Sequence, residues 1–149
     1  MEQHHTHDVE HDLQEAREAG LSDEFYAHAL TPQNVGMLPN PDGHAMPKGA
    51  CGDYIELFLR IDDDLITDAR FMPEGCLNTV ACGSAVTSLA KGASLREAAE
   101  IDAERIEGLL GGLHKDHRHC AVLAAATLKA AIRDYLKKRS EPWKRPYAK

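Results

Sequence analysis

The chain has 149 residues and a formal net charge of −7, from 24 acidic and 17 basic residues. This length predicts a single domain with one modest core, and the acidic balance excludes the basic surface that nucleic-acid binding needs. The first residues lack a secretory signal pattern, and no apolar run approaches the ~20 residues that span a bilayer. We therefore expect a soluble, cytoplasmic protein without membrane contact, in which the four cysteines are metal ligands or reactive thiols rather than disulfides.

Residues 1–22 are polar and rich in histidine and glutamate, which predicts a mobile arm or a weak helix. Of these two, we expect residues 1–22 to form a mobile polar N-terminal arm. His-rich tracts bind metals transiently, although a solvated tail is the simpler interpretation of this one. Ordered structure is expected to begin at residue 23, where Ser22 is placed to cap a helix that runs through His28.

From residue 54 the pattern becomes that of a β-hairpin. Residues 54–61 and 65–72 are rich in β-branched and aromatic side chains, and three aspartates at 62–64 separate them. Alternation along the first strand puts four apolar side chains on one face: Ile55, Leu57, Leu59 and Ile61.

Helical patterns fill the rest of the chain, and local signals mark their ends. Ser94 and Glu97 form a capping-box pattern, Asp102 is a second N-cap, and Gly92 and Gly111 are placed to end helices. The expected helices are residues 79–91, a short helix from 94, a third from 102 to 111 and a long one from about 119 to 139.

Strands followed by helices predict an α+β domain. We expect this domain over residues 23–139, after the N-terminal arm, and a basic tail over residues 140–149. The cations of this tail suit either an acidic partner surface or a solvated helix end.

Three cysteines stand out because each lies beside a second metal ligand or at an expected helix start. Cys51 has glycine next to it and Asp53 two residues on, Cys76 precedes a helix, and His119 directly precedes Cys120. Free amides at helix starts favour thiolates. Thiolates with one harder ligand suit a zinc ion or a small iron–sulfur cluster. No Cys-x-x-Cys pair occurs, so the fold must assemble the site from distant segments.

The fourth cysteine, Cys82, is expected to pack in the core. It follows Cys76 by six residues, roughly 240° around a helix axis, and would not share its face. A supplementary ligand or sulfur acceptor is the minor alternative. The histidines at 28, 44, 114 and 117 are interpreted as solvated or loop residues, although His114 and His117 lie near enough to Cys120 to tune its proton balance.

Six short motifs occur in order between residues 25 and 138. They are Pro-Gln-Asn-Val-Gly at 32–36, Ala-Cys-Gly-Asp at 50–53, Phe71 with Gly-Cys at 75–76, Lys-Gly at 91–92, His-Cys-Ala-Val-Leu-Ala at 119–124 and Ala-Ala-Ile-Arg-Asp-Tyr at 130–135. With these motifs the chain resembles the IscU/NifU N-terminal class of iron–sulfur cluster assembly scaffolds.

This resemblance implies a three-stranded sheet with helices packed on one side. It also implies a scaffold, not an enzyme, that takes sulfur from a cysteine desulfurase, gathers iron, builds a labile [2Fe–2S] cluster and passes it to apo iron–sulfur client proteins. By motif, Cys51, Cys76 and Cys120 are the cluster ligands, with Asp53 and His119 as alternatives for the remaining position. Zinc, iron and cluster stay open as the resting metal, as do a monomer and a cluster-loaded dimer.

Some features depart from the family pattern. Scaffolds served by a dedicated Hsp70 chaperone carry Leu-Pro-Pro-Val-Lys before the His-Cys pair, whereas residues 113–117 here are Leu-His-Lys-Asp-His, which argues against that partner. The alternative function is a zinc-bound, SufU-like sulfur acceptor that stimulates a desulfurase. That type carries an insertion between the second and third cysteines and lacks the histidine, so His119 favours the cluster scaffold.

A third interpretation is a zinc domain in which the metal only holds the fold together. The accessible ligands that glycines flank argue against this interpretation.

Overall fold

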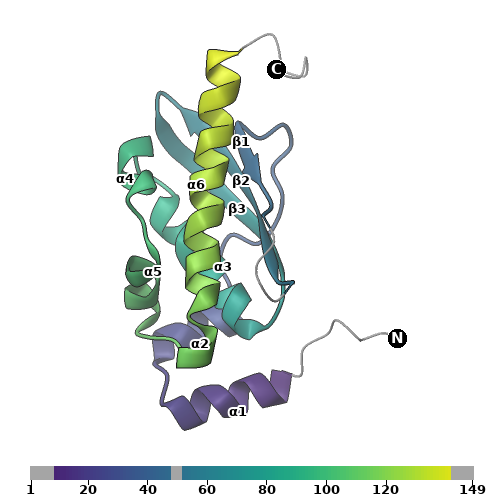
Figure 1. The fold of residues 1–149 in the computed structure, drawn as a ribbon, viewed down its shortest axis with the longest axis vertical. Coiled ribbons are helices and arrows are strands. Elements are labelled where there is room, and N and C mark those ends of the chain that lie inside the picture. The colour runs from purple at the N-terminus through teal and green to yellow at the C-terminus, as the bar shows by residue number, and fades with distance from the viewer. Residues whose placement is uncertain (1–8, 48–51, 142–149) are drawn as a thin grey trace, which may run out of the picture.

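The computed structural model describes residues 9–47 and 52–141, and these form three strands and six α-helices (Figure 1). In chain order the elements are α1 (Val9–Ala19), α2 (Asp23–Leu30), β1 (Gly43–Ala45), β2 (Tyr54–Asp62), β3 (Leu65–Glu74), α3 (Leu77–Ala90), α4 (Leu95–Ala99), α5 (Ala103–Leu110), the short 3₁₀ helix η1 (Lys115–His117) and α6 (His119–Ser140). None of the helices in this part of the chain is long and apolar enough to cross a membrane. The predicted α+β class is confirmed.

The strands form one antiparallel sheet in the order β1–β2–β3. Asp62 pairs with Leu65, so the turn of the β2–β3 hairpin consists of Asp63 and Asp64 alone. Their φ angles are 53° and 61°, the positive values of a type I′ turn, whose twist matches that of the flanking strands. Aspartate tolerates this conformation better than most residues do. The predicted hairpin is confirmed.

One face of this hairpin lies against the core. The four side chains predicted to point inward are all buried: Ile55, Leu57, Leu59 and Ile61. Both long helices cover this face, α3 against β3 and α6 against β1 and β2, and Figure 1 shows α6 running along the sheet. The sheet therefore has its helical layer on one side, as the family resemblance implied.

The close packing of α3 on β3 depends on Gly83. A Cβ atom on this residue would overlap the ring of Phe71, which is completely buried. Glycine within a helix costs about 0.5–1 kcal/mol relative to alanine. Here that cost is offset by the contact of the α3 backbone with an aromatic ring.

Local signals set three helix starts as predicted, whereas α3 begins at Leu77, ahead of the expected residue 79, and α2 continues past His28 to Leu30. Ser22, Ser94 and Asp102 each cap a helix through a side-chain oxygen, and Ser94 is part of a complete capping box. The helix α5 ends at Gly111, whose φ of 75° is left-handed. These predictions succeed because each depends only on neighbours within one helical turn.

Two elements carry no such local signal. Within residues 1–22 the structure has the helical alternative over Val9–Ala19, and Ala16 of this helix is buried in the core cluster. The strand β1 is too short to show an alternating pattern, and it is recognised only by its pairing with β2 and its packing against α6.

His28 differs from the solvated histidine that the sequence suggested. Its Nδ1 lies 2.6 Å from the Oγ of Ser84, so the side chain joins α2 to α3. Partial burial lowers the pKa of His28 from its ordinary value of 6.5, because desolvation disfavours the charged imidazolium.

Replacing Gly83 by alanine is expected to lower the free energy of unfolding by about 1–3 kcal/mol, because the added methyl group would push α3 away from Phe71. Gly108→Ala in α5 is the matched control, since a Cβ there meets no atom within 4 Å. The control should raise the free energy of unfolding by about 0.5–1 kcal/mol through helix propensity. Urea denaturation measures both changes, and shifts of the same sign would contradict the packing argument.

The contribution of His28 to stability should be lost in mild acid. The unfolded chain takes up a proton near the ordinary pKa of 6.5, whereas the folded imidazole resists protonation. The free energy of unfolding therefore falls as the pH drops from 6.5 toward the lowered pKa. Because His28→Gln removes this titration, the stability of the variant should depend less steeply on pH in this window. Denaturant unfolding at several pH values tests this, and identical slopes for the two proteins would refute it.

Candidate metal centre

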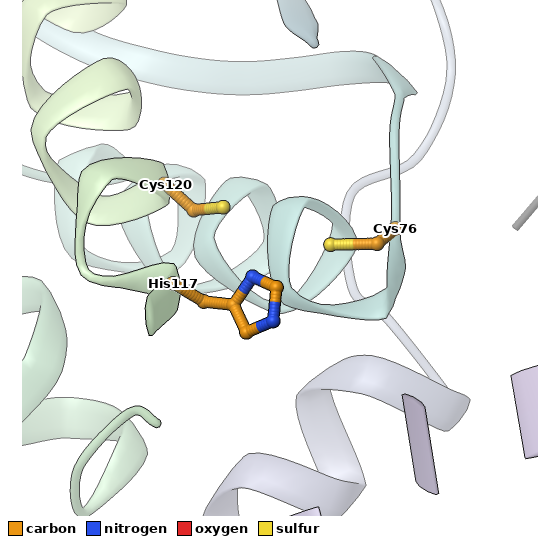
Figure 2. A group of neighbouring side chains, drawn as sticks. All are labelled: Cys76, His117 and Cys120. Atoms are coloured by element: carbon orange, nitrogen blue, oxygen red, sulfur yellow. The ribbon is translucent and has the colours of Figure 1, made fainter. Parts of the chain in front are cut away.

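The N-termini of α3 and α6 meet near one end of the molecule, and each carries a cysteine. Cys76 is the N-cap residue of α3, and Cys120 is the second residue of α6. Both are buried, with 6% and 0% of their surface exposed. Figure 2 shows the two sulfur atoms pointing into one space, with the ring of His117 beside it. The fold thus brings together two cysteines from distant parts of the sequence.

Hydrogen-bond donors surround the sulfur atom of Cys76. The side-chain amide of Asn78 donates to it at 3.4 Å, and the backbone amides of Asn78 and Thr79 also favour its ionised form. Both amides belong to the first turn of α3, and that of Thr79 also donates to the carbonyl oxygen of Cys76 at 3.0 Å. Cys76 therefore lies where a thiolate is stabilised.

A hydrogen bond between the two thiols shifts their pKa values in opposite directions. The Cys120 thiol donates to the sulfur of Cys76, which, together with the surrounding donors, lowers the pKa of Cys76. The same hydrogen bond raises the pKa of Cys120, and burial raises it further. The pair thus favours a thiolate on Cys76 and a proton on Cys120. A metal ion bound by both sulfur atoms would displace that proton.

A buried hydroxyl group lies between the two cysteines and Asp53. Thr79 Oγ1 donates to Asp53 Oδ2 at 3.1 Å, and it lies 3.6 Å from the sulfur of Cys120 and 3.9 Å from that of Cys76. Thr79 is completely buried. Sequence reasoning missed this residue because its only signal was its position one turn after Cys76.

Gly75 leaves room for these contacts. A Cβ at this position would lie 2.6 Å from Thr79 Oγ1 and 2.9 Å from Asp53 Cγ, and the φ of +157° further disfavours a side chain. A larger residue before Cys76 would therefore separate Asp53 and Thr79 from the sulfur atoms.

In the described part of the chain, two groups of side chains are close enough to hold a metal ion. The potential ligand atoms within each group lie within 4.8 Å of one another. One group is Asp53, His119 and Cys120, and the other is Cys76, His117 and Cys120. Thiolate, imidazole and carboxylate ligands suit zinc and iron–sulfur centres, so the donor set fits the metal chemistry expected from the sequence.

Four of the five predicted ligands therefore lie around Cys120: Cys76 is in one group with it, and Asp53 and His119 are in the other. The fifth, Cys51, lies outside the described residues. The ligand roles themselves stay predictions. His117 joins the group although the sequence suggested a loop histidine, and its position one turn before Cys120 was the available signal.

Cys82 does not belong to this centre. It is completely buried within the hydrophobic core cluster, and burial raises the pKa of its thiol. The predicted packing role is confirmed.

The helix α1 covers the exposed side of the centre. A cleft is lined by His11, Asp12 and Glu15 of α1 together with Asp53, Cys76, His117 and His119. Asp12 Oδ2 accepts a hydrogen bond from the Leu77 amide at 3.2 Å, which places a carboxylate at the N-terminus of α3. In Figure 1, α1 lies across the end of the molecule where α6 begins.

Comparison with known proteins connects this centre to a family. Residues 21–142 match the sequence model of the NifU-like N terminal domain. The iron–sulfur cluster assembly scaffold protein IscU of Escherichia coli K12 is 39% identical over 127 residues, which cover 79% of this chain and 95% of that protein.

Two solved structures share the fold at lower sequence identity. The N-terminal NifU-like protein of Brucella abortus matches with a TM-score of 0.65 and 19% identity, over 78% of this chain and 94% of that one. A candidate SUF-system scaffold from Fervidobacterium islandicum matches with a TM-score of 0.62 and 22% identity, over 74% and 95% of the two chains. The sequence match over most of the chain and the shared fold agree, and the chain belongs to the family of NifU-like N-terminal domains.

Proposed function

We propose that this chain is a scaffold on which an iron–sulfur cluster is assembled and from which it is handed on. The observation that carries the proposal is the meeting of Cys76 and Cys120 with Asp53 and His119 beside one cleft. The scaffold names of the relatives support it. In this function the cluster is cargo, so the protein needs a site that both forms and releases it.

The proposed cluster ligands are the thiolates of Cys51, Cys76 and Cys120, with Asp53 or His119 in the remaining position. The assignment of Cys51 rests on the motif it shares with Asp53, two residues later in the sequence. A centre with an oxygen or nitrogen ligand in place of a fourth thiolate exchanges that ligand more readily. Such lability suits a donor of [2Fe–2S] clusters.

Sulfur enters by transfer from a persulfide on a cysteine desulfurase. A scaffold thiolate attacks the outer sulfur of that persulfide, a new S–S bond forms on the scaffold, and the desulfurase cysteine leaves as a thiolate. This transfer involves no net oxidation or reduction. Reduction of the bound sulfur to sulfide then draws electrons from ferrous iron and from an external thiol or ferredoxin-type reductant. The lowered pKa of Cys76 supports its role as a thiolate in this chemistry.

Anaerobic reconstitution with iron, cysteine and a cysteine desulfurase should give a red-brown protein that passes its cluster to an apo-ferredoxin. Cys51→Ser, Cys76→Ser and Cys120→Ser should each abolish the visible absorption, because each change removes a thiolate ligand. Cys82→Ala is the matched control and should keep the colour, since Cys82 is buried in the core. A colourless wild type that keeps one zinc ion and accelerates the desulfurase would instead support the SufU-like alternative.

Asp53→Ala should slow cluster release to an apo-protein by about tenfold, because the carboxylate is the ligand that an incoming thiolate displaces most easily. Asp62→Ala, at the exposed tip of the hairpin, is the matched control and should leave the transfer rate unchanged. Transfer is followed by circular dichroism of the two cluster environments. Equal rates in the two variants would exclude Asp53 from the exchange step.

A further inference from the structure

His117 has no role in the ligand set that the family motifs imply, yet it lies in the metal centre. It is the last residue of η1, one turn before Cys120. Only 21% of its side chain is exposed, and its ligand atom lies within 4.8 Å of the sulfur atoms of Cys76 and Cys120. A solvated loop histidine would be more exposed and would not face two thiols.

Glu15 of α1 determines which ring nitrogen of His117 is free. Glu15 Oε1 lies 3.0 Å from His117 Nε2. Because a carboxylate only accepts hydrogen bonds, Nε2 carries a proton, and in the neutral ring Nδ1 then holds the lone pair. Figure 2 shows one ring nitrogen on the side of the two sulfur atoms and the other turned away from them. In this tautomer the nitrogen available to a metal is Nδ1.

The spacing of the three side chains suits a tetrahedral ion. Bonds of about 2.0–2.3 Å from zinc to nitrogen and sulfur put neighbouring ligand atoms roughly 3.5–4 Å apart. The ligand atoms of Cys76, His117 and Cys120 lie within 4.8 Å of one another, so they need to move only slightly closer. Metal-binding histidines also donate their second ring N–H to a carboxylate or carbonyl, and Glu15 is such a partner.

We propose that His117 is a further metal ligand, oriented by Glu15, and that it forms a site for a single ion with Cys76 and Cys120. This inference rests on the proposed function for the identity of the metal, zinc or iron, whereas the ligands follow from the geometry of the three side chains. Cys120 also belongs to the group with Asp53 and His119. The centre therefore offers two neighbouring groups of ligands that share Cys120 and differ in the other two side chains.

Anaerobic titration with Co²⁺ tests this proposal. Charge-transfer absorption from thiolate to cobalt reports only ions bound through cysteine, so the histidines near the N-terminus do not contribute to the signal. His117→Ala should weaken this binding at least tenfold. Glu15→Ala should weaken it by about 10–100-fold, the usual effect of removing the partner of a metal-bound histidine.

Two control variants match these changes. His44→Ala removes a histidine that pairs with Glu56 on the sheet, and Glu18→Ala removes a carboxylate from α1 that contacts Gln14. Both should bind Co²⁺ as the wild type does. A loss of affinity in either control equal to that in the test variants would overturn the assignment to His117 and Glu15.

Nitrogen-15 NMR of the zinc-loaded wild type provides a readout that does not depend on any variant folding. His117 should show a metal-bound Nδ1 and a protonated Nε2, whereas a structural histidine would show no metal shift. If the wild type binds neither Co²⁺ nor Zn²⁺ through cysteine, the proposed function fails as well. If it binds them while the His117 nitrogens stay unshifted and His117→Ala binds equally well, only this inference fails.

Discussion

The metal centre depends on the N-termini of α3 and α6 lying next to each other. α3 and α6 pack against each other on one face of the sheet, and their first turns converge at Cys76 and Cys120. Each helix start presents amides without helical partners and favours negative charge. A cysteine at each start therefore brings two sulfur atoms into one place where a thiolate is stable. A hydrogen bond between the two thiols lowers the pKa of Cys76 and raises that of Cys120.

The surroundings of Cys76 and Cys82 shift the pKa values of these two thiols in opposite directions. Cys76 and Cys82 lie within seven consecutive residues at the start of α3, yet the pKa of Cys76 is lowered and that of Cys82 is raised. Cys76 meets hydrogen-bond donors at the helix start, whereas Cys82 lies in the apolar core beneath it. The packing that holds α3 close to the sheet therefore also buries the Cys82 thiol and disfavours its ionised form.

The features predictable from the sequence are those with local causes. The caps at Ser22, Ser94 and Asp102 and the hairpin turn depend on neighbouring residues, so their patterns are visible in the chain. The candidate metal ligands are predictable from the family motifs and from the tendency of helix N-termini to stabilise thiolates. The contacts of Thr79 and the orientation of the His117 ring could not be predicted, because they arise between segments distant in the sequence. Thr79 reaches Asp53 across the gap that Gly75 leaves open, and His117 is turned by a carboxylate from α1.

The helix α1 lies outside the part of the chain that matches the family, which begins at residue 21. Its carboxylates nevertheless contact the first turn of α3 and the ring of His117. The cysteines and the charges that surround them thus come from two segments on which evolution can act separately. A substitution confined to α1 can therefore change the charge beside the centre while every cysteine stays in place.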